Sequence, residues 1–240
     1  MFEVNPAIKR LSETRATTGG LTYNGVIHRT GVLVLATGIA FVLTWRGLQS
    51  GAMAPGLGLG ALVVGTLLGL LIIFTRATNP LLIGAYALAQ GVMLGTVSYF
   101  ANRRFPGIAI EAVAGTLGCF VVVLWLYSMR VLRATPVFTK VILGAMIGIA
   151  VIYLADIVGG FFGHPLDIVR GNSAMSIGLS AVIVLVAAVS FVIDFAAIEQ
   201  AVAEGADERQ GWHYAFALLL GLIWLYMEIL RLLSKVRSRD

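Results

Sequence analysis

Three acidic residues interrupt long apolar stretches of this sequence: Asp156, Asp194 and Glu228. Placing an ionisable side chain in hydrocarbon costs at least about 2.5–3.5 kcal/mol on insertion scales, so such residues are functional candidates by default. Burial disfavours the charged form of a carboxylate, whereas a nearby arginine favours it. These carboxylates could therefore bind cations or change protonation along a polar path. Glu111 lies near the start of its apolar stretch, where its side chain can simply reach the membrane interface.

A structural role is the alternative for each of these acids. Glu228 and Arg231 are three residues apart, so they share one helix face and can neutralise each other. Asp194 lies near the end of its stretch, and Arg76 ends another stretch on the same side. The sequence therefore leaves open whether these carboxylates act in function or only in ion pairs.

The composition places these acids in a membrane protein. Of the 240 residues, 59% are hydrophobic and 12% are charged, against roughly 45–50% and about 25% in an average soluble domain. One cysteine and six prolines exclude a disulfide scaffold and a proline-rich linker protein. The net charge of +5 comes from basic residues that stand singly or in pairs between apolar runs, which argues against a nucleic-acid-binding face.

Charged residues divide the apolar sequence into seven segments that are long enough to cross a bilayer. A membrane helix needs about 20 apolar residues, whereas a barrel strand needs roughly 10. In lipid, every backbone polar group must also be satisfied within its own segment. The sequence therefore predicts an all-α, polytopic membrane protein with a polar N-terminal tail of residues 1–29 and a transmembrane domain of residues 30–240. The predicted spans are about 30–46, 57–75, 79–100, 109–132, 139–163, 174–198 and 212–233.

Seven crossings put the two chain ends on opposite sides of the membrane. Nine of the 17 basic residues then lie on the side of the N-terminal tail and eight on the other, so counting positive charges does not determine the orientation. The basic tail gives a slight preference for a cytoplasmic N-terminus. A re-entrant last segment would instead bring both basic ends to one side.

The acids form two layers when depth is taken as about 1.5 Å per helical residue. Asp194 lies near the end of the sixth span, on the side of the loop that leads to the seventh. Asp156 and Glu228 lie late in the fifth and seventh spans, which finish on the opposite side, where Glu111 also lies.

Small residues recur four positions apart within three of the spans. Such pairs form flat strips against which a neighbouring helix can pack closely. We expect these strips to serve packing within the bundle, with a dimer interface as the alternative. The pairs are Gly65 and Gly69, Gly91 and Gly95, and Gly144 and Gly148.

The sequence lacks the motifs of several membrane enzymes. Neither a Gly-x-Ser-x-Gly nucleophile motif nor a His-Glu-x-x-His zinc motif occurs. Asp156 follows Leu154-Ala155 and Asp194 follows Val192-Ile193, which differ from the motifs of intramembrane aspartyl proteases. No lysine precedes Lys235 in the last span, where a retinal protein would need one. We therefore expect neither enzymatic activity nor a cofactor.

Several segments together resemble one family of membrane proteins. The tail contains Asn5-Pro6-Ala7 and Asn24-Gly25-Val26, and Thr30-Gly31 opens the first span. The sixth span contains Phe191-Val192-Ile193-Asp194-Phe195, and the seventh contains Trp224-Leu225-Tyr226-Met227-Glu228. In their order and in the seven-span layout, these segments resemble the bacterial Bax inhibitor-1-like family from the tail to the C-terminus.

The resemblance implies a bundle around a central last helix and a pH-sensitive, passive calcium leak in the bacterial inner membrane. In that family an Asp on the sixth helix pairs with one on the seventh, and their shared protonation controls opening. Asp194 matches the first position, whereas the second falls at about Gly221. We therefore expect Asp194 to sense pH and to bind calcium transiently, with Glu228, Asp156 and Arg76 as further residues of the sensor or pathway.

A second hypothesis is a regulatory membrane protein that conducts nothing. Such a protein would bind and modulate another membrane protein, for example a quality-control protease. The two hypotheses differ in what they require of Asp194. A channel needs this carboxylate for calcium flux and for its response to protons, whereas a binding protein should tolerate Asp194→Asn if it still folds.

Overall fold

The computed structural model describes residues 20–164 and 166–239. In this part of the chain all regular elements are helices, and seven of them are long and apolar enough to cross a membrane. The predicted all-α, polytopic fold is therefore confirmed. The long helices are α2 (Tyr23–Gln49), α3 (Leu57–Thr75), α4 (Pro80–Arg104), α5 (Ile108–Ser128), α6 (Pro136–Phe161), α8 (Ala174–Ala203) and α9 (Gln210–Arg237), and the short helix α7 is Asp167–Arg170.

The first helix begins at Tyr23, before the predicted start of the first span at about residue 30. Thr22 caps the helix, because its hydroxyl accepts a hydrogen bond from the backbone N–H of Gly25 (3.1 Å). Arg29, counted as part of the tail, forms an ion pair with Glu208 (2.6 Å) and so fixes the start of α2 against the α8–α9 loop. Residues 1–19 of the predicted tail, with Asn5-Pro6-Ala7, lie outside the described residues.

The other helix ends differ from the predicted spans mostly because helices continue past the apolar run. α8 extends to Ala203 rather than to residue 198, and α9 covers Gln210–Arg237 rather than 212–233. α5 is shorter and ends at Ser128, where the backbone turns and Arg130 takes a positive φ of 61°. Apolar length thus marks the membrane crossing, whereas hydrogen bonding and capping set the ends of the helix.

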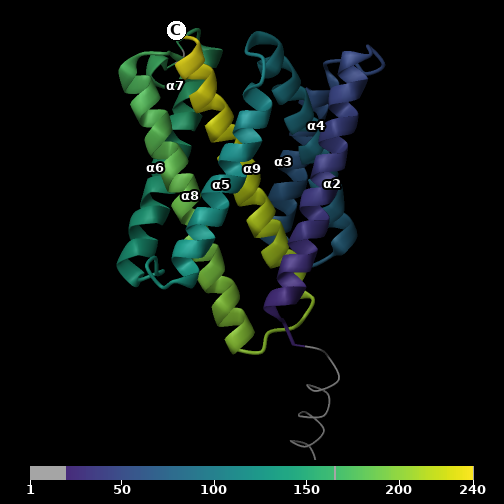
Figure 1. The fold of residues 1–240 in the computed structure, drawn as a ribbon, viewed down its shortest axis with the longest axis vertical. Coiled ribbons are helices and arrows are strands. Elements are labelled where there is room, and N and C mark those ends of the chain that lie inside the picture. The colour runs from purple at the N-terminus through teal and green to yellow at the C-terminus, as the bar shows by residue number, and fades with distance from the viewer. Residues whose placement is uncertain (1–19, 165, 240) are drawn as a thin grey trace, which may run out of the picture.

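The last helix lies at the centre of the bundle. Figure 1 shows the helices running up and down, with α9 crossing diagonally between them. α9 contacts α2, α4, α5 and α8, which agrees with the expectation of a central last helix. It is an uninterrupted helix of 28 residues, so the re-entrant alternative does not apply. We call the end at which α2 begins the N-terminal end of the bundle and the opposite one the C-terminal end.

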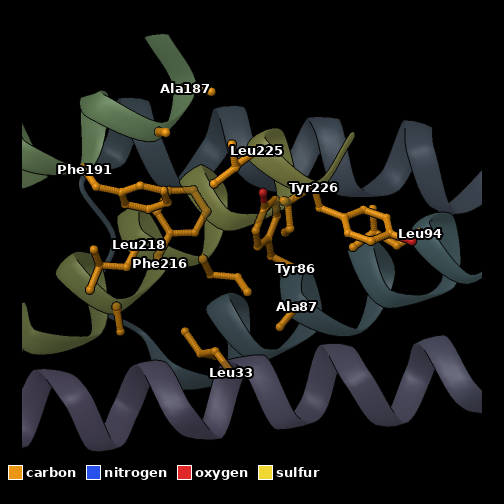
Figure 2. Close-up of a cluster of buried hydrophobic side chains, with 14 of the residues drawn as sticks. Leu33, Tyr86, Ala87, Leu94, Ala187, Phe191, Phe216, Leu218, Leu225 and Tyr226 are labelled. Carbon is orange, nitrogen blue, oxygen red and sulfur yellow. The ribbon is translucent and has the colours of Figure 1, made fainter. Parts of the chain in front are cut away.

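The core is formed where α9 meets α2, α4 and α8 (Figure 2). Phe216 of α9 packs edge-on against Tyr86 of α4, with ring centroids 4.9 Å apart. Phe191 of α8 and Leu33 of α2 are almost completely buried in the same cluster. These large side chains hold α9 in place, so residues on α9 have fixed positions relative to α8.

The glycine strips pack in two different ways. An added Cβ would lie 2.4 Å from the Thr37 carbonyl oxygen at Gly91 and 2.7 Å from the Phe41 carbonyl oxygen at Gly95, so α4 packs backbone to backbone on α2. By contrast, a Cβ at Gly144 or Gly148 would meet nothing within 4 Å in the described chain. Packing within the bundle is confirmed on α4 and is wrong on α6, because α6 lies at the periphery and packs mainly against α8 and α7.

Candidate functional site

Asp194 faces a cavity of about 420 Å³ between α6, α8 and α9. The cavity forms because α6 packs mainly against α8 and leaves a gap beside α9. Its polar lining includes Tyr153 of α6, Ser190 of α8 and Trp224 of α9, and the remaining lining is mostly aliphatic. These residues lie in the middle stretches of their helices, so the cavity is at mid-depth in the bundle.

The carboxylate of Asp194 forms no ion pair within residues 20–164 and 166–239. Ser190 lies one turn away in the same cavity, but its hydroxyl donates to the carbonyl of Ala187 (2.8 Å). Asp194 is only partly buried, so its carboxylate is accessible from the cavity. An acid in this position can accept a proton or bind a cation without breaking an existing ion pair.

Glu228 lies in the opposite situation, because its carboxylate is only 2% exposed and has several donors. Tyr153 donates from its hydroxyl (2.7 Å), Trp224 from its indole N–H (3.2 Å) and Arg231 from its guanidinium (3.4 Å). Arg231 also lies over the ring of Tyr153, 4.6 Å from its centroid. Glu228 and Arg231 therefore form the ion pair that their spacing along the helix predicted.

Asp156 is held by a residue that we did not expect as its partner. Both of its carboxylate oxygens accept from Nε of Arg170, each at 2.9 Å, and one also accepts from the backbone N–H of Leu166 (3.0 Å). Arg170 lies on the short helix α7, which the apolar pattern did not predict. One feature of the sequence could have indicated this pair: Arg170 lies in the loop that directly follows the span of Asp156.

Arg76 forms no ion pair with Asp194 in the described chain, so the pairing that their matching depth suggested is wrong. Arg76 ends α3 in a left-handed conformation with φ of 49°. α3 packs against α4 and makes no substantial contact with α8, so matching depth did not place the two side chains together. Glu111, at the other end of the bundle, forms an ion pair with Arg237, and both side chains are partly exposed.

Gly221 lies where the resemblance placed a second carboxylate. It lines the same cavity as Asp194, so counting back from the C-terminal motif identified the facing position on α9. A Cβ at Gly221 would lie 2.8 Å from Cε1 of Phe191, so the present packing of that ring depends on the glycine. The cavity therefore contains one carboxylate, from Asp194, rather than two.

A resident metal centre has no support in the described residues. Within 20–164 and 166–239, no group of three or more His, Cys, Asp or Glu side chains could hold a metal ion. Stable calcium sites use six to eight oxygen ligands. In the described chain, the cavity beside Asp194 does not provide such a ligand set.

The fold and these buried ionisable groups define the class: a polytopic helical membrane protein with polar groups inside its bundle. The sequence profile of the family described as Bax inhibitor 1 like matches residues 5–238, which is nearly the whole chain. The chain therefore belongs to the Bax inhibitor 1 like family, and the resemblance noted in the sequence is confirmed. Comparisons with curated proteins and with solved structures gave no match.

Proposed function

We propose that this family member is a passive, pH-sensitive cation leak for calcium in a bacterial inner membrane, and not an enzyme. The observation that carries the proposal is the carboxylate of Asp194, which faces a mid-depth cavity and forms no ion pair in the described chain. An ionised Asp194 attracts a cation into this cavity, and a protonated one does not. Occupancy by a cation therefore follows the protonation of Asp194.

The proposed path continues from this cavity toward the C-terminal end of the bundle. Tyr153 lines the cavity and donates to Glu228, which in turn accepts from Arg231. Arg231 also lines a second cavity of about 810 Å³ at the C-terminal end. Tyr153 and Glu228 thus separate two cavities, and the hydrogen bond between them links α6 to α9. Because α6 has few other contacts with α9, we propose that moving α6 opens the path.

The test is calcium flux into liposomes that contain the purified protein, with the pH stepped from acidic to neutral. Wild type should leak in a pH-dependent manner, and Asp194→Asn should remove the dependence on pH. The matched control is Glu199→Gln on the same helix, because Glu199 already accepts from Arg130 (2.8 Å) and Tyr127. The control should keep the pH dependence of wild type.

The competing regulatory function relies on another feature, the open faces of Gly144 and Gly148 on α6. Small residues on an exposed face allow another membrane helix to approach closely. If folded protein, checked by circular dichroism, gives no flux above empty liposomes, the leak is rejected and the regulatory function is favoured. Deleting residues 2–20 provides a second comparison, since it should spare a leak and impair a protein that binds a partner through its tail.

A further inference from the structure

A second cavity, of about 810 Å³, lies at the C-terminal end of the bundle between α4, α6, α7 and α9. Its lining contains four basic side chains and a single carboxylate, that of Asp156. The basic residues are Arg104, Arg170, Arg231 and Lys235, and the neutral polar ones include Asn172, Ser234 and Ser238. The lining therefore carries more positive than negative charge.

Lys235 is the most unusual of these side chains, because it is only 7% exposed and no carboxylate neutralises it within the described chain. Its ammonium donates to the hydroxyls of Ser176 (2.8 Å) and Ser180 (2.7 Å) and to the Ser176 carbonyl (3.3 Å). These partners are neutral. A buried charge without a counter-charge is costly, so an anion in the adjoining cavity would stabilise it.

The acidic groups near the cavity already have cationic partners. Asp156 accepts from Arg170, and Glu228, just outside the lining, accepts from Arg231. Arg104 forms no ion pair within residues 20–164 and 166–239, and its guanidinium lies over the ring of Phe105 at 5.5 Å from the centroid. After these pairs are counted, the charges of Arg104 and Lys235 remain without an opposite charge.

We propose that this cavity binds an anionic phosphate group, carried by a phospholipid headgroup or free in solution. Guanidinium groups match the geometry of phosphate oxygens, and a lysine adds a point charge. The cavity adjoins the ends of α4 and α9, which is the depth at which lipid headgroups lie, and basic pockets between membrane helices bind such headgroups. This cavity lies at the C-terminal end of the path proposed above, but the binding of an anion rests on its basic lining and not on calcium flux.

The test is thermal unfolding of the full chain in detergent, titrated with phosphatidylglycerol, with zwitterionic phosphatidylcholine, or with inorganic phosphate against sodium chloride of equal ionic strength. A ligand that binds the folded state raises Tm with its concentration. Arg104→Gln should weaken the affinity about tenfold, so that about ten times more ligand is needed for the same rise in Tm. This is the loss expected for one charge-assisted hydrogen bond. Arg103→Gln is the matched control, because Arg103 carries the same charge on the preceding residue and lies outside the cavity lining. It should respond like wild type.

The outcomes separate the two sources of the anion. A response to phosphatidylglycerol alone supports a headgroup site, and a response to inorganic phosphate alone supports a site for the free anion. Lys235→Met provides a second variant, since it replaces the ammonium group by an unbranched, uncharged side chain and should also weaken the response. Equal responses to the two lipids without any response to phosphate, or equal losses in the Arg103 and Arg104 variants, would overturn the proposal. The absence of any rise in Tm would do so as well.

Discussion

Glu228 and Asp194 are two acids within the membrane-spanning helices of one bundle, yet their surroundings are opposite. Glu228 is almost completely buried and accepts hydrogen bonds from Tyr153, Trp224 and Arg231. Asp194 is partly buried, faces a cavity and has no ion pair in the described chain. An acid inside a span therefore does not by itself identify a functional site, because the donors around it determine whether its charge is already compensated.

The largest effect that we expect from this contrast is on stability at Glu228. Glu228→Ala leaves the donors of Tyr153, Trp224 and Arg231 without their shared acceptor, and should lower the free energy of unfolding by about 3 kcal/mol. Glu228→Gln keeps an acceptor oxygen and should cost less. Thermal unfolding in detergent followed by circular dichroism measures both. An Asp194→Ala variant that is destabilised as much as Glu228→Ala would remove the contrast.

Tyr153→Phe tests the connection between the two regions. The change removes the hydroxyl that donates to Glu228 at 2.7 Å and should cost about 1 kcal/mol of stability. Because this hydrogen bond links α6 to α9, the variant should also leak calcium faster than wild type in the liposome assay. Phe100→Leu, in the lining of the other cavity, is the control for a nonspecific loss of stability and should not leak faster. A loss of stability without faster flux would show that Tyr153 does not close the path.

Asp194→Asn should change stability by less than about 0.5 kcal/mol, because no ion pair is lost. Its effect should fall on the pH dependence of flux instead. Unfolding curves and flux measured on one preparation separate the two effects. Destabilisation by 2 kcal/mol or more, which is about the cost of a lost charged hydrogen bond, would indicate that Asp194 has a structural partner.

Arg76→Gln should have the smallest effect. Arg76 ends α3, which packs against α4 and not against α8, so neutralising it should leave basal calcium flux and its pH dependence unchanged. Flux into liposomes at neutral and acidic pH provides the check. A raised basal flux would show that Arg76 does influence Asp194.

The sequence predicted the seven crossings well, because the length of an apolar run follows directly from the thickness of the bilayer. It also anticipated the contact of Glu228 with Arg231, since residues three apart share a helix face. It did not reveal that Asp156 pairs with Arg170 or that Glu228 accepts from Tyr153. Those partners come from other elements, and their positions depend on how the helices pack.

The failed pairing of Asp194 with Arg76 has the same physical origin. Depth along a span can be estimated from the helical rise, but it does not show which helices are neighbours. The position facing Asp194 was found at Gly221 only because the C-terminal motif resembled a known family. The open face of Gly144 and Gly148 was missed because spacing alone does not distinguish a strip that faces the bundle from one that faces outward.

We propose that Asp194 is the group in the bundle that changes protonation between acidic and neutral pH. Infrared difference spectroscopy on the reconstituted protein tests this directly, because a protonated carboxylic acid has its own carbonyl stretching band. We predict a carboxylic acid band that titrates in wild type, persists in Glu228→Gln and is absent in Asp194→Asn. A titrating band that survives in Asp194→Asn would contradict this proposal.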